Sequence, residues 1–213
     1  MVVGRGGGFR AAWTRVRPMG EAEAGSPALS GSSDAAWSAR YPAVGLVAYD
    51  SSWVVRYEEL AASLRAGLGP GWNIEHVGST SIPGLCAKPV IDLALGEPHD
   101  HDLSSLSATF RALGWTEPIV LGDHQAVFML SGTVRVAICH IFSDEQWETA
   151  HVRLFADWLR SHDDERDAYQ RLKSGLVTDG VWGSEYTRSK AEFVLRVVNL
   201  ARSSRQLPPV RVL

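Results

Sequence analysis

The stretch from Glu75 to Asp92, EHVGSTSIPGLCAKPVID, constrains the fold of this chain more than any other. The β-prone residues 74–77 predict a short strand, and Gly78 with Ser79 ends that strand in a turn of small residues. The apolar residues 90–95 predict a second strand. The stretch therefore indicates a strand, a small-residue turn, a connector and another strand.

This turn and the strand after it carry groups suited to a phosphate and a metal ion. The small residues Gly78 and Ser79 leave room for backbone N–H groups to reach an anion, as in other glycine-bearing phosphate loops. Asp92 is the one carboxylate in an otherwise apolar run, and burying an ionised carboxylate there is costly unless it is paired or binds a metal. A nucleoside triphosphate (NTP) site needs this combination of a phosphate-binding turn and a candidate Mg²⁺ ligand.

The run IEHVGSTSIPGLCAKPVIDLAL resembles the signature of the GrpB family, in the nucleotidyltransferase superfamily. Supporting matches are VGLVAYDSSWVVRYEEL before it and LKSGL with EYTRSKAEF near the end, so the resemblance covers residues 44–198. It implies an α+β fold of the nucleotidyltransferase type, with a mixed β-sheet packed with helices and further C-terminal helices. It also implies chemistry on an NTP, for which ATP is the expected substrate and Mg²⁺ (or Mn²⁺) the expected cofactor.

The chain departs from the pattern of the wider superfamily at one place, as GrpB relatives usually do, and from the pattern of those relatives at two others. The wider superfamily carries a second acid two residues after the first, on the same face of the strand, where this chain has Ala94. Relatives often show His-x-His where only His140 matches here, and an arginine where this chain has Ala156. These losses favour either a specialised substrate or a module that binds nucleotide without turnover.

Length and composition set the outer limits. A chain of 213 residues with 45% hydrophobic residues fits one domain with extensions. Its formal net charge of −3 argues against a general nucleic-acid binder, which would usually be basic. No apolar run of 18 or more residues and no signal core is present, so neither a membrane span nor secretion is expected. Cys86 and Cys139 do not form a metal-type pair, which fits a reduced, cytoplasmic protein.

The pattern along the chain divides it into three parts. Residues 1–40 are rich in Gly, Ser, Ala and Arg without a sustained period and are expected to form a flexible extension. Residues 41–202 are expected to form the domain, and residues 203–213 a tail. Two strands, 126–130 and 134–142, are expected to form a hairpin. The residues expected to cap or start helices are Asp50, Asp100 or Asp102, Asp144, Asp163 or Asp164, and Ser184.

Several polar side chains beyond Asp92 are candidates for the site. Tyr186 and Lys190 are four residues apart and so share a helix face, and with Lys173 they would form a cationic wall for the triphosphate. The alternative for these residues, and for Lys88, is a solvated surface. Glu75 and His76 alternate faces on their strand, so at most one of them shares the Asp92 side in a simple pairing.

The candidate residues define a function. We expect Mg²⁺-dependent transfer of a nucleoside monophosphate from an NTP to a small-molecule acceptor. The accepting group would be a hydroxyl, an amine or a carboxylate. A carboxylate acceptor would give an adenylated acid for ligation or cyclisation. The alternative is a non-catalytic, nucleotide-binding accessory module. The catalytic candidates are Asp92, His140, Lys173 and Lys190; the nucleotide-binding candidates are Gly78, Ser79, Thr80, Ser81, Lys88 and Tyr186; the metal-ligand candidates are Asp92, Glu75 and His76. For Glu75, His76 and His140 a purely structural hydrogen bond is the alternative, and for Thr80 and Ser81 the alternative is that they cap a helical turn.

The composition of the N-terminal part yields a first prediction. A chain that begins at Tyr41 is expected to keep the thermal midpoint of the full chain, because residues 1–40 have no apolar period with which to pack. Differential scanning calorimetry of the two chains checks this. A clear drop in the midpoint of the shorter chain would show that the extension packs on the domain.

Overall fold

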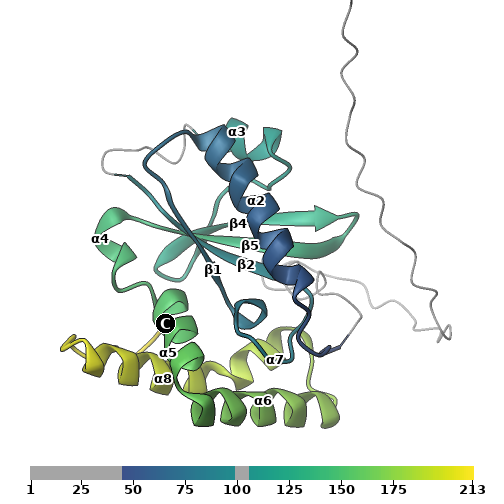
Figure 1. Cartoon of the computed structure of the whole chain (residues 1–213), viewed down its shortest axis with the longest axis vertical. Helices are drawn as coiled ribbons and strands as arrows, with labels where there is room; N and C mark the ends of the chain where they lie inside the picture. Colours follow the sequence, from purple (N-terminus) through teal and green to yellow (C-terminus); the bar gives the residue numbers. More distant parts are fainter. Residues whose placement is uncertain (1–44, 99–105) are drawn as a thin grey trace, which may run out of the picture. The chain divides into compact units, whose positions relative to one another are not determined.

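In the computed structural model, residues 45–98 and 106–213 are described, and they form one mixed sheet packed with helices (Figure 1). The strand order is β1-β2-β5-β4-β3; β2 and β5 are parallel, and every other neighbouring pair is antiparallel. The strands are β1 (Asn73–Val77), β2 (Ile91–Gly96), β3 (Ile119–Leu121), β4 (His124–Ser131) and β5 (Val134–Phe142). The expected mixed α+β fold is confirmed, whereas the extension 1–40 and the candidate caps Asp100 and Asp102 lie outside the described residues.

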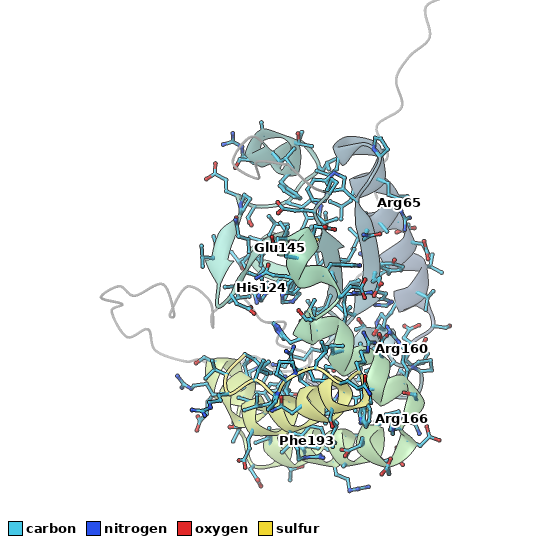
Figure 2. The ribbon with its side chains drawn as sticks, turned by 90° about the vertical axis from the view of Figure 1, so that its left-hand side faces the viewer. Arg65, His124, Glu145, Arg160, Arg166 and Phe193 are labelled. Atoms are coloured by element: carbon cyan, nitrogen blue, oxygen red, sulfur yellow. The ribbon has the colours of Figure 1, made fainter. Side chains whose placement is uncertain are left out.

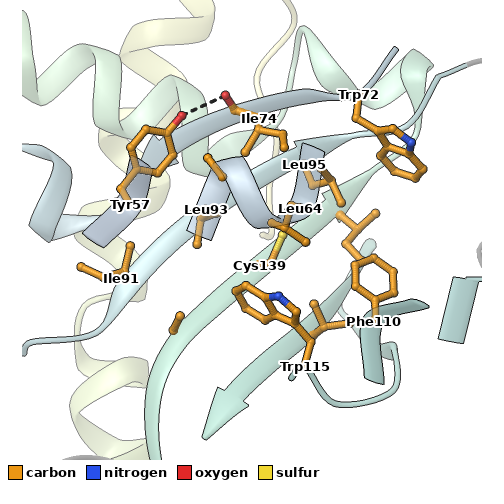
Figure 3. Packing of buried hydrophobic residues seen from close by; sticks show 14 of the residues in the cluster. Tyr57, Leu64, Trp72, Ile74, Ile91, Leu93, Leu95, Phe110, Trp115 and Cys139 are labelled. Atoms are coloured by element: carbon orange, nitrogen blue, oxygen red, sulfur yellow. Dashed lines mark hydrogen bonds between the residues drawn. The ribbon is translucent and has the colours of Figure 1, made fainter. Parts of the chain in front are cut away.

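One face of the sheet is closed by α2 (Ser52–Leu68) and α3 (Ser107–Ala112). Successive strand residues point to opposite faces, so Leu93 and Leu95 of β2 meet these helices. The Tyr57 hydroxyl of α2 donates a hydrogen bond of 3.0 Å to the carbonyl oxygen of Ile74 (Figure 3). Because this face is filled with apolar side chains, Asp92 and its neighbours on the alternate positions of β2 point to the other face.

The C-terminal helices form a second layer on the Asp92 side of the sheet. Figure 1 shows α5 (His151–Ser161), α6 (Asp163–Thr178) and α8 (Ala191–Ser204) side by side, with α7 (Gly183–Ser189) next to α6. Ile82 of the β1–β2 connector is fully buried among side chains of these helices. Nowhere in the described ranges is a helix both long and apolar enough to span a bilayer. The helices thus supply a wall opposite the Asp92 carboxylate.

The helix starts differ in three places from those expected. The N-cap position of α2 is Ser51 and not Asp50, although the Asp50 carboxylate accepts from the Ser52 amide at 2.8 Å. Ser143, and not Asp144, caps α4 (Asp144–Trp147), because its hydroxyl accepts from the Gln146 amide while the Gln146 side chain accepts from the Ser143 amide. The helical spacing of Trp147, His151, Leu154 and Trp158 predicts one helix from Asp144 onward, but α4 ends at Trp147 and α5 begins at His151. The Arg153 guanidinium donates to the Trp147 carbonyl at the end of α4. The last helical segment likewise begins at Gly183, one residue before the expected cap, and is interrupted at Lys190.

Candidate functional site

The turn after β1 lies directly against the Asp92 side chain. Val77 pairs with Asp92 across the two strands, and Gly78 follows with φ +68° and ψ −173°, a conformation essentially restricted to glycine. A Cβ atom on residue 78 would lie 2.7 Å from both Cβ and Cγ of Asp92. Gly78 is therefore required both by the backbone angle and by the carboxylate packed against it, so the structure brings the turn and Asp92 together.

Lys173 of α6 holds the next residue of the turn. It is only 1% exposed, and its ammonium donates to Ser79 Oγ at 3.2 Å and to the Cys86 carbonyl. An ammonium has donors only, so the Ser79 hydroxyl accepts this bond and its own proton is left to donate elsewhere. Burial, aided by the charge of Lys190, lowers the pKa of Lys173 to about 7.

A cavity of about 280 Å³ opens beside this turn, between the sheet and the C-terminal helices. Lys88 Nζ lies 4.0 Å from the ring centroids of both Trp182 and Tyr186, and Lys190 Nζ lies 4.4 Å from that of Tyr186. Burial and then Lys190 lower the pKa of Lys88 to about 8. Of the site residues expected from the sequence, the following line the cavity: Gly78, Ser79, Lys88, Asp92, His140, Lys173, Tyr186 and Lys190.

The cavity is unbalanced in charge. Three of its lining residues, Lys88, Lys173 and Lys190, are lysines, whereas Asp92 is the only carboxylate that the described residues contribute to its lining. An aromatic ring lies next to each of the three ammonium groups and stabilises the cation. Three lysines against one carboxylate among the described lining residues suit the binding of a polyanion such as a triphosphate.

The Asp92 carboxylate makes no hydrogen bond or ion pair with any residue in the described part of the chain. It keeps some exposure to the cavity, although protein atoms surround it closely. That burial raises the pKa of Asp92 to about 7, against the opposing effect of Lys190 and Arg135. A cation bound beside it would favour the ionised form, as expected for a metal ligand.

The other two candidate metal ligands are held elsewhere. Glu75 lies on the Asp92 face of β1, but its carboxylate forms a two-pronged ion pair with Arg153, at 2.7 and 2.9 Å. His76 lies on the opposite face and stacks on Tyr57 with 4.7 Å between ring centroids. Burial, with Arg160, lowers the pKa of His76 to about 4, so its ring is neutral. The structure therefore does not bring Glu75 and His76 together with Asp92.

Thr80 and Ser81 brace the turn and do not line the cavity. Thr80 Oγ1 is buried, 3.0 Å from His76 Nε2 and 3.4 Å from the Val90 carbonyl oxygen. The Ser81 hydroxyl donates to the Gly78 carbonyl at 2.8 Å. These bonds fix the backbone of the turn that carries Gly78 and Ser79.

Two functional candidates were missed in the sequence, His124 and His151. His124 Nε2 lies 2.9 Å from Nδ1 of His140, and His151 lines the cavity. The sequence presents His140 as a lone histidine in a strand, and its neighbour becomes visible only from the β4–β5 register, in which Ala126 pairs with His140. The helical spacing puts His151 on the apolar face of one long helix, although it is the first residue of α5.

Ala94, where the wider superfamily has its second acid, and Ala156, where relatives often have an arginine, lie in one apolar cluster. Both are fully buried, together with Val77, Phe142 and Trp147. The place on β2 where a second acid would stand is thus occupied by an apolar contact between the sheet and α4–α5. A carboxylate at position 94 would be buried there without a partner, which is costly.

Comparisons with known proteins agree with the resemblance in the central motif. The family described as GrpB protein matches residues 43–199. A UPF0157 protein of Pseudomonas aeruginosa is 34% identical over 169 residues, covering 76% of this chain and 69% of that one. A UPF0157 protein of Halalkalibacterium halodurans is 31% identical over 164 residues, covering 76% and 84%. The crystal structure of the conserved protein GrpB from Enterococcus faecalis has the same fold, with a TM-score of 0.65 at 24% identity, over 76% of this chain and 99% of that one.

The packing of Gly78 predicts an unequal effect of two glycine substitutions. Gly84 has φ +80°, and apart from its chain neighbours no described atom would lie within 4 Å of a Cβ added there, so Gly84→Ala should cost only the backbone strain of about 1–2 kcal/mol. Gly78→Ala adds a clash with Asp92 and should cost about 1–3 kcal/mol more. Urea unfolding of both variants measures the difference, and equal losses would contradict the close contact.

The raised pKa of Asp92 predicts a pH-dependent gain from Asp92→Asn in metal-free buffer. The folded state holds the proton up to about pH 7, whereas the unfolded chain loses it near 3.8, so the wild type loses stability as the pH rises between these values. The Asp92→Asn variant has no carboxyl proton to lose at this position. Its advantage in free energy of unfolding should therefore grow from pH 4 to pH 7, to about 2–4 kcal/mol, and stay constant above. Denaturant titrations across pH 4–8 check this; a variant less stable than the wild type at pH 8 would show that Asp92 neutralises a structural cation.

Proposed function

The chain belongs to the GrpB family, and on that premise we propose that it is an Mg²⁺-dependent nucleotidyltransferase. It would transfer a nucleoside monophosphate from an NTP, with ATP expected, to a small-molecule acceptor. The observation that carries the proposal is the contact of the Gly78 turn with the Asp92 carboxylate, in a cavity lined by three lysines.

The donor set fits Mg²⁺ in the company of a nucleotide. Mg²⁺ is commonly held by one or two carboxylates, with substrate phosphates and water completing its octahedron. Asp92 supplies one carboxylate, and Glu75 is occupied by Arg153. When bound with the nucleotide, the ion would neutralise charge on the phosphates. With a single protein carboxylate, we expect Mg²⁺ to bind appreciably only together with the NTP.

The turn and the lysines would hold the triphosphate. The Ser79 hydroxyl, which accepts from Lys173, can donate its proton to a phosphate oxygen. Lys88 and Lys190 lie over the Tyr186 ring, where their charges reach the same cavity. Ammonium groups held in a partly dry site interact more strongly with phosphate than they would in water. This supports a role for them in stabilising the departing pyrophosphate.

The proposed transfer step is a displacement at the α-phosphorus. A nucleophilic oxygen or nitrogen of the acceptor would attack this phosphorus, and the bond to the bridging oxygen would break, so that pyrophosphate leaves. A hydroxyl or amine acceptor would lose its proton to solvent, whereas a carboxylate acceptor has no proton to lose. His140 lines the cavity as a neutral ring, because burial keeps its pKa well below the usual value, and would hydrogen-bond the substrate. A carboxylate acceptor would give an adenylated acid, competent for ligation or cyclisation.

One observation favours a second candidate, a nucleotide-binding accessory module without turnover. The position of the second superfamily acid is Ala94, fully buried against apolar residues. Pyrophosphate release separates the two functions. Incubation with MgATP and pools of small hydroxy, amino and carboxylic acids should release pyrophosphate if the chain is a transferase, and MgATP binding without release would support the module.

Nucleotide binding itself tests the site. Ser79→Ala should weaken MgATP affinity by about 5- to 150-fold, the equivalent of losing one charge-assisted contact of about 1–3 kcal/mol. Asp92→Asn should remove the difference in affinity between ATP with Mg²⁺ and ATP with EDTA. Isothermal titration calorimetry measures both, with Ser161→Ala at the exposed end of α5 as the control. Unchanged affinity in Ser79→Ala would refute the phosphate assignment.

A further inference from the structure

We propose that Asp123, His124 and His151 form a second binding site, for a divalent transition-metal ion such as Zn²⁺, next to the cavity that His151 also lines. One ligand atom from each of these residues lies within 4.8 Å of the others. Asp123 and His124 stand at the turn that enters β4, and His151 opens α5 (Figure 2 labels His124). The site brings the sheet and the C-terminal helices to one point.

The three groups are close to ligand geometry. Zn²⁺ binds imidazole nitrogen and carboxylate oxygen at about 2.0–2.2 Å, so in its usual tetrahedral geometry two ligand atoms lie about 3.3–3.6 Å apart. Asp123 Oδ1 is already 3.0 Å from His124 Nδ1. The side chain of Asp123 is 64% exposed. Closing the set from atoms up to 4.8 Å apart therefore takes a movement of about 1–1.5 Å.

The neighbours hold the ligands in place. The Asp123 carbonyl accepts a 2.7 Å hydrogen bond from Gln146, which belongs to the capping box of α4. The His124 ring is 7% exposed and stacks on Phe142 with 4.6 Å between centroids, and the His151 ring meets it edge-on at 5.3 Å. Such fixed rings favour metal binding, because little side-chain freedom remains to be lost.

The two histidine rings of the set differ in their hydrogen bonds. His151 makes no hydrogen bond with any described residue, so neither of its ring nitrogens is engaged by another described side chain. The 2.9 Å contact between His124 Nε2 and His140 Nδ1 can run in either direction. When His124 donates, its Nδ1 lone pair faces the Asp123 carboxylate, and two acceptors so close repel unless a cation lies between them.

The ligand types select the class of ion. Two imidazoles and one carboxylate suit Zn²⁺ and its first-row neighbours, whereas Mg²⁺ and Ca²⁺ prefer oxygen ligands alone. Three protein ligands leave a coordination position open, as in catalytic rather than structural zinc sites. The His124–His140 hydrogen bond would fix the ligating tautomer of His124 and connect the ion with a residue of the cavity wall.

Metal titration of the full chain, without nucleotide, tests this inference. We expect Zn²⁺ to bind with one-to-one stoichiometry in calorimetry, Co²⁺ to give visible absorption bands in the same site, and Mg²⁺ alone to give neither. Asp123→Asn and His151→Ala should each weaken Zn²⁺ affinity at least tenfold. His162→Ala is the matched control, because His162 stacks on Trp158 at 3.7 Å, outside the proposed site, and should bind like the wild type.

The outcomes separate this site from the nucleotide site. Thermal midpoints measured without metal establish whether each variant folds. If His151→Ala does not fold, Asp123→Asn still tests the site, because Asp123 is exposed. A wild type that fails to bind Zn²⁺ would overturn the inference, as would undiminished binding in folded Asp123→Asn or His151→Ala. Ser79→Ala should keep full Zn²⁺ affinity, so that a failure of the proposed nucleotidyl transfer leaves this result unaffected.

Discussion

The packing of the Asp92 side chain against the backbone of Gly78 is the constraint on which the rest of this structure depends. It requires β1 and β2 to pair in the register that sets Val77 opposite Asp92. A slip of one residue would turn Asp92 into the apolar layer under α2 and expose Leu93 instead. The buried face of the sheet therefore secures the position of the one carboxylate that the described residues present to the cavity.

The positive side of the cavity comes from distant parts of the chain. Lys88 belongs to the connector between β1 and β2, Lys173 to α6, and Lys190 to the junction of α7 and α8. Their ammonium groups converge because the C-terminal helices pack on Ile82 and Leu85 of that connector. A hydrophobic contact thus places the charges, and Lys173 then ties α6 directly to the turn through Ser79.

Much of this arrangement could be predicted from local patterns in the sequence. The Gly78–Ser79 turn, the lone Asp92 in an apolar strand and the four-residue spacing of Tyr186 and Lys190 all carry short-range signals. The ion pair between Glu75 and Arg153 joins residues 78 apart, and the His124–His140 contact depends on strand register, so neither has a local signal. The three-residue strand β3, with Val120 78% exposed, is too short to show a period.

The crowding of ammonium groups has a consequence for how the cavity responds to an anion. Lys88 and Lys173 have pKa values of about 8 and 7, because burial and the charge of Lys190 disfavour their charged forms. Both side chains are therefore partly deprotonated near neutral pH. A polyphosphate among them would restore those charges, and the protein would draw protons from its surroundings as it binds. The heat of association would then vary with the ionisation enthalpy of the buffer, and before an anion binds the cavity is less basic than its three lysines suggest.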